Sequence, residues 1–143
     1  MLSAYEALNT QYLASSLGKE VVQTGRAPKP VGLYSQAVLA GGWLFISGQI
    51  PIDPATGELV KGSFKDRVRR VLENVKAVVE AAGGSLDDVV KVTVYLSDIG
   101  RYGEFNEVYS EYFKGARPAR AVVGAEVPKG AEVEVEAVAY IGG

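Results

Sequence analysis

Residues 64–82 read FKDRVRRVLENVKAVVEAA, and residues 89–96 read VVKVTVYL. In the first stretch the apolar residues recur at steps of three and four, which predicts an amphipathic helix with one apolar stripe. Ser63 and Asp66 have the spacing of a capping box at its start, and Gly83-Gly84 is suited to end it. The second stretch is rich in valine and predicts a buried strand. Together the two stretches indicate a helix that packs on a sheet.

The rest of the chain supplies more strands and a second amphipathic helix. The predicted strands are Lys19–Thr24, Tyr34–Leu39, Gly42–Ser47, Ala119–Gly124 and Ala131–Ile141, and the second helix is Tyr102–Phe113. Gly41-Gly42 predicts a hairpin turn, and Asp53–Gly57 predicts a second turn. This order predicts an α+β fold, a mixed sheet with two helices packed on one face. Because several strands are apolar on both faces, we expect another subunit to cover the second face.

A chain of 143 residues has the length of about one domain. We place that domain at residues 19–143 and treat residues 1–18 as an N-terminal extension of different composition. In the extension Tyr5, Leu8 and Tyr12 have helical spacing, and Gly18 could end such a helix. Two interpretations stay open: an ordered extra helix that packs on the domain, or a segment without such a role, which is either a frayed tail or the result of an upstream start codon.

Composition excludes several classes of chemistry. With no cysteine and no histidine, the chain has no thiolate nucleophile and no Ser-His-Asp triad, and it lacks the usual ligands of zinc and iron. Acid–base chemistry must therefore use Asp, Glu, Tyr, Lys or water. The net charge of −2 does not indicate the excess of basic residues that nucleic-acid binding usually needs. No apolar run is long enough to cross a membrane, and the start of the chain lacks a secretory signal pattern, so we expect a cytoplasmic protein.

The last predicted strand carries a row of acidic residues. Alternation places Glu132, Glu134 and Glu136 on one face, which becomes apolar toward the end of the strand. The row is either a solvated face or the wall of a cleft whose carboxylates favour a nearby cation. Arg120 is a candidate for that cation, because guanidinium is well suited to bidentate binding of a carboxylate. As an isolated residue, Arg120 would fit an ordinary surface position better.

Three further residues have both a structural and a functional interpretation. Gly48 interrupts a strand pattern, which indicates a bulge or a close backbone approach whose amide could point at an oxyanion. Tyr34 is either a core residue or part of a cleft wall. Asn106, on an otherwise apolar helix, is either a satisfied polar group or an interface contact.

Several ordered segments together resemble one known family, the reactive intermediate imine deaminases (RidA, also called YjgF). The resemblance covers residues 19–143 and runs through GLYSQA at 32–37, SGQIP at 47–51, DPATGE at 53–58, NVKAV at 74–78, NEVY at 106–109, PAR at 118–120 and EVEA at 134–137. Two departures stand out: Leu33 replaces the usual proline, and the segment from Arg120 to Pro128 is one residue shorter than the common spacing.

The resemblance implies a chorismate-mutase-like α+β fold in a trimeric barrel assembly, with clefts between adjacent subunits. It implies hydrolysis of 2-imino and 2-enamino acids to 2-keto acids and ammonia, with no cofactor and no metal. In this interpretation Arg120 binds the substrate carboxylate and Glu134 orients the attacking water. The other implied substrate-binding residues are Tyr34, Ser47, Gly48, Asn106 and Val122.

Two alternatives remain within the resemblance. The first is a non-catalytic ligand-binding or regulatory trimer that senses keto or imino acids through Arg120. The second is an RNA-cleaving or translation-inhibiting protein, which the acidic balance and the absence of histidine disfavour.

Overall fold

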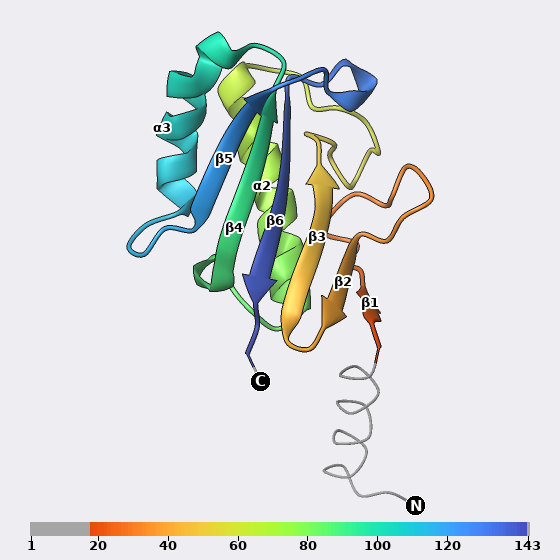
Figure 1. Ribbon diagram of the computed structural model, residues 1–143. Coiled ribbons are helices and arrows are strands. Elements are labelled where there is room, and N and C mark those ends of the chain that lie inside the picture. The colour runs from red at the N-terminus through yellow and green to blue at the C-terminus, as the bar shows by residue number, and fades with distance from the viewer. Residues whose placement is uncertain (1–17, 143) are drawn as a thin grey trace, which may run out of the picture.

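The computed structural model describes residues 18–142, which form a six-stranded mixed sheet with two α-helices on one of its faces (Figure 1). The predicted helix in residues 1–17 lies outside the described residues. The sheet has the order β1-β2-β3-β6-β4-β5, in which only β4 and β5 are parallel neighbours. No helix among residues 18–142 is both long enough and apolar enough to cross a membrane.

The elements follow the predicted order along the chain. The strands are β1 (Glu20–Val22), β2 (Ala37–Ala40), β3 (Trp43–Gln49), β4 (Val89–Leu96), β5 (Ala119–Gly124) and β6 (Val133–Tyr140), and the helices are α2 (Phe64–Ala81) and α3 (Tyr102–Tyr112). The prediction that a strand begins at Tyr34 is wrong, since Tyr34 lies in the loop before β2. Its amide donates to the Gly32 carbonyl at 3.0 Å, so this residue belongs to a tight turn and makes no ladder bond.

Helix α2 begins and ends as its sequence predicts. The Ser63 side chain accepts from the Asp66 amide, and the Asp66 carboxylate accepts from the Ser63 amide, which completes the capping box. Gly83, just after the helix, has a φ of 91°, a conformation that favours glycine. The apolar stripe of α2 is fully buried against the inner face of the sheet, where it forms the centre of the hydrophobic core.

One polar residue of α2 holds the loop that follows β3. Asn74 is completely buried, and its amide nitrogen donates to the carbonyls of Ile50 (3.3 Å) and Ile52 (3.0 Å). Its carbonyl oxygen accepts from Arg70 Nε at 3.0 Å. A buried amide whose hydrogen bonds are made in this way is costly to replace, because its partners would be left without theirs. The contact fixes the backbone directly beyond the Gly48 segment.

No helix among residues 18–142 covers the other face of the sheet, which is partly apolar. Val21, Val38, Phe45 and Val138 lie opposite one another on four neighbouring strands and form one continuous row across it. We call these four residues the open apolar row. Phe45 is 49% exposed, although apolar side chains of this size usually lie inside a protein.

Candidate active site in two separate cavities

Strand β3 contains a bulge at the glycine singled out by its position in a strand pattern. Ile46 lies opposite Ala137 and Gln49 lies opposite Val135, so β3 uses one more residue than β6 over this interval. A Cβ atom on Gly48 would lie 2.8 Å from the carboxyl carbon of Glu134 and 3.0 Å from its Oε2. Both parts of the prediction for Gly48, a bulge and a close approach, are therefore confirmed.

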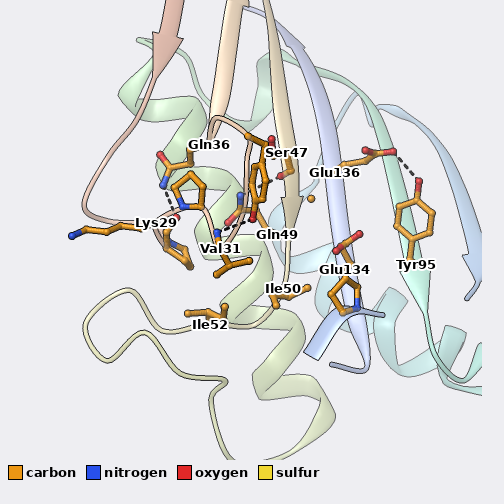
Figure 2. Close-up of a pocket in the computed structure, with 15 residues that line it drawn as sticks. Lys29, Val31, Gln36, Ser47, Gln49, Ile50, Ile52, Tyr95, Glu134 and Glu136 are labelled. Carbon is orange, nitrogen blue, oxygen red and sulfur yellow. Dashed lines mark hydrogen bonds between the residues drawn. The ribbon is translucent and has the colours of Figure 1, made fainter. Parts of the chain in front are cut away.

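The bulge borders a cavity of about 440 Å³ on the open face of the sheet, which we call the glutamate cavity (Figure 2). It brings four predicted site residues together, and its lining includes Tyr34, Ser47, Gly48, Tyr95, Glu134 and Glu136. The loop before β2 is held in place by side-chain hydroxyls. Ser47 Oγ donates to the Ser35 carbonyl at 2.6 Å, and the Tyr34 hydroxyl accepts from the Val31 amide at 3.1 Å.

The two carboxylates in this cavity differ in their partners. Glu136 accepts a hydrogen bond from the Tyr95 hydroxyl at 2.9 Å, which Figure 2 shows as a dashed line. Glu134 makes no side-chain hydrogen bond or ion pair with any residue in 18–142, although it is half-buried. Burial raises the pKa of Glu134 above its ordinary value, and the nearby negative charge of Glu136 adds to the effect. The Glu134 carboxylate therefore lies in the cavity without a hydrogen-bond donor from residues 18–142.

A second cavity, of about 430 Å³, lies between α3 and β5. We call it the arginine cavity, and its lining includes Asn106, Tyr109, Ser110, Arg117, Pro118 and Arg120. The guanidinium of Arg120 lies over the Tyr109 ring, with Cζ 4.6 Å from the centroid. Arg120 Nη2 also donates to the Tyr102 hydroxyl at 3.0 Å.

Arg120 has no ion pair with any carboxylate in the described part of the chain. A half-buried guanidinium with aromatic neighbours and no counter-charge favours binding of an anion. Its planar array of donors matches the two oxygens of a carboxylate. The arginine cavity is therefore suited to hold a carboxylate ligand.

The two cavities lie on opposite faces of the sheet. Arg120 lies beside Val92 of β4, whose other neighbour is Ala137, and Val92 and Ala137 both belong to the core on the helix side. Glu134 lies beside Tyr95, on the open face. The prediction that Arg120 is the cation next to the acidic row is therefore wrong within one chain. The reason is the register: Val92 and Tyr95, the β4 neighbours of Arg120 and Glu134, are an odd number of residues apart and so point to opposite faces.

Two other predicted residues have structural surroundings that the sequence did not indicate. Val122, two positions after Arg120 on β5, packs its side chain against the core. Glu132 lies just before β6 and not in the acidic row. It pairs with Arg67 of α2 and, at 3.4 Å, with Arg101, and so ties the start of α2 to the strand.

Sequence reasoning missed the aromatic residues around Arg120. Tyr102, Phe105 and Tyr109 recur on α3 at steps of three and four, a spacing that predicts one helix face. The sequence shows this spacing, but the three rings contact Arg120 only because β5 packs beside that face of α3. Among residues 18–142, no group of three or more Asp or Glu side chains is arranged to hold a metal ion.

Comparison with known proteins relates this geometry to a family. A family model described as Endoribonuclease L-PSP matches residues 24–141. A RutC family protein of Pyrococcus horikoshii is 60% identical, with 85% of this chain and 98% of that protein covered. A human protein named 2-iminobutanoate/2-iminopropanoate deaminase is 45% identical, with 90% and 94% covered. The crystal structure of RidA from an Antarctic Psychrobacter superimposes with a TM-score of 0.83 at 48% identity, with 85% and 99% covered. The chain belongs to the RidA/YjgF family.

Proposed function

We propose that this protein is a hydrolytic deaminase that converts 2-imino and 2-enamino acids to 2-keto acids and ammonia. The observation that carries the proposal is the pair of unsatisfied charged groups: Arg120, which lacks a counter-charge, and Glu134, whose carboxylate lacks a hydrogen-bond partner within residues 18–142. The first suits the substrate carboxylate, and the second suits a water molecule. The name of the human relative supports the same reaction.

The active site is assembled from two subunits of a homotrimer. Within one chain the arginine cavity and the glutamate cavity face away from each other, so neither could complete the site alone. In a trimer the arginine cavity of one subunit faces the glutamate cavity of its neighbour. The open apolar row supports assembly, since an exposed apolar surface of this kind usually marks an interface. Light scattering should give three times the chain mass of 15.2 kDa, and a single-chain mass would contradict the assembly.

Each residue has a defined part in the reaction. Arg120 grips the substrate carboxylate through two N–H donors and thereby places the C=N carbon beside a water molecule on Glu134. Water adds to that carbon, one of its protons passes to the Glu134 carboxylate, and Glu134 gives this proton to the nitrogen to form a carbinolamine; Glu134 then carries the remaining hydroxyl proton to the same nitrogen. The C–N bond then breaks, the C=O bond forms, and ammonia leaves. Burial keeps the pKa of Glu134 above its usual range, which makes it a stronger base than an exposed glutamate.

In the deciding experiment, an amino-acid oxidase or dehydratase generates the imine in situ, and the release of ammonia and keto acid is measured. The wild type should accelerate release, and Arg120→Ala should lose nearly all of that acceleration, because a charge-assisted carboxylate grip is worth about 2–5 kcal/mol. Circular dichroism and thermal unfolding serve as the control for folding. A wild type that binds 2-keto acids without accelerating hydrolysis would instead identify a non-catalytic ligand-binding trimer.

A further inference from the structure

Three aromatic rings of α3 surround the guanidinium of Arg120. Its Cζ lies 4.6 Å from the Tyr109 ring centroid, 5.6 Å from that of Tyr102 and 5.9 Å from that of Phe105. Tyr109 is the nearest, and its own ring stacks on Phe113 with centroids 4.5 Å apart. Cation–π contacts of this kind hold a guanidinium against a ring face. They leave it able to turn within its own plane, because a ring face offers no directional acceptor.

The hydroxyl of Tyr102 restricts the rotation of the Arg120 guanidinium within its plane. It accepts from Arg120 Nη2 at 3.0 Å, and a hydrogen bond favours one orientation of its donor. The same hydroxyl interacts with Asn106, one helical turn further along α3. The hydrogen bond from Asn106 lowers the pKa of Tyr102, and the adjacent Arg120 charge lowers it further. Tyr102 and Arg120 are therefore joined by a hydrogen bond, and Asn106 lines the arginine cavity with Arg120.

We infer that Tyr102 is a positioning residue: its hydroxyl fixes the in-plane orientation of the Arg120 guanidinium and so directs the remaining N–H donors toward the ligand carboxylate. The inference rests on the proposed function for the identity of the ligand, but the geometry of Arg120 itself does not depend on it. Tyr109 sets the plane of the guanidinium and Tyr102 sets its rotation. Bidentate recognition requires both, since two parallel bonds form in only one rotational setting.

Removal of the hydroxyl should weaken binding without changing the chemical step. Tyr102→Phe keeps the ring and loses the acceptor, so KM for the imine should rise about three- to tenfold, the effect of one modest hydrogen bond. The value of kcat should stay within about twofold, because Arg120 keeps its charge and its other donors, so the substrate that binds is still held in the same place. The dissociation constant of 2-ketobutanoate should rise by the same factor as KM. Tyr102→Leu should raise both further.

A double-mutant cycle separates positioning from a general structural effect. In an Arg120→Lys background, Tyr102→Phe should change 2-ketobutanoate binding little, because an ammonium has no plane to orient. The matched control is Tyr112→Phe, on the same helix, because Tyr112 does not line the arginine cavity. It should leave KM unchanged.

The order parameter of the Arg120 Nε–H group, measured by NMR, tests the inference apart from catalysis. It should fall in Tyr102→Phe and stay at the wild-type value in Tyr112→Phe. An unchanged order parameter and unchanged 2-ketobutanoate binding in Tyr102→Phe would overturn the inference, as would an equal loss of binding in the Arg120→Lys background. If the wild type releases no ammonia, the proposed function fails, while the order parameter still decides the role of Tyr102.

Discussion

Gly48 and Glu134 approach so closely that one methyl group on Gly48 would lie 2.8 Å from the Glu134 carboxyl carbon. Gly48→Ala should therefore displace the Glu134 side chain and lower kcat/KM by about 10²-fold, the scale expected when a reacting group moves by about 1 Å. Steady-state kinetics would measure the loss. Gly25→Ala is the matched control, since a Cβ there meets no atom within 4 Å and should leave activity intact. An active Gly48→Ala would show that Glu134 can move without consequence.

Glu134 and Glu132 should respond differently to the same substitution. Glu134→Gln removes the proposed base and should lower kcat by about 10²–10⁴-fold, with binding of a 2-keto acid nearly unchanged. Glu132→Gln breaks the ion pairs to Arg67 and Arg101, so it should lower the unfolding temperature and leave kcat close to wild type. Kinetics and thermal unfolding of both variants check this. Equal losses of kcat would mean that the glutamates act only as a charged face.

The raised pKa of Glu134 should appear in both activity and stability. The acid limb of kcat/KM should lie above the range of an ordinary glutamate, because the base must be ionised to work. For stability, the folded protein binds this proton more tightly than the unfolded chain does, so the favourable contribution of Glu134 is present below its unfolded pKa. The contribution is lost as the pH rises through the folded pKa. Urea unfolding of the wild type and Glu134→Gln from about pH 4 to about pH 7 should show the wild type losing stability relative to the variant.

A site divided between subunits should permit two inactive variants to restore each other. In trimers formed by co-expressing Arg120→Ala and Glu134→Gln in equal amounts, about one cleft in four should contain both native residues if mixing is random. The mixture should therefore recover about a quarter of wild-type activity per chain, although each variant by itself is nearly inactive. An ammonia-release assay of the purified mixture measures the recovery. A mixture no more active than its components would place both residues in one subunit.

Local patterns predicted most elements well. Helix α2 and strands β4 and β5 begin at the predicted residues, because periodicity and the Ser63–Asp66 capping box are encoded by neighbours along the chain. Tyr34 was misplaced on a strand because the turn at Gly32 uses the amide that the strand would need.

The face on which Arg120 lies was beyond local reasoning. Alternation predicts which residues of one strand share a face, but it does not say which strands are neighbours. Arg120 lies beside Val92 and Glu134 lies beside Tyr95, three residues further along β4, so the two side chains lie on opposite sides of the sheet. The two cavities could be predicted only in part: their residues came from the family resemblance, and their separation depends on the register of the paired strands.

Because β3 contains a bulge, the deletion of one residue from this strand would have an unusual effect. Ile46 and Gln49 both have buried side chains, although they are an odd number of residues apart, so the additional residue between them reverses the alternation. Deletion of Gly48 would give a regular ladder in which the glutamine still faces the core. The shortened strand would thus keep its hydrogen-bonded pairing with β6, but the backbone beside Glu134 would change its conformation. The extra residue between Ile46 and Gln49 is therefore not needed for strand pairing, but it gives the cavity wall beside Glu134 its shape.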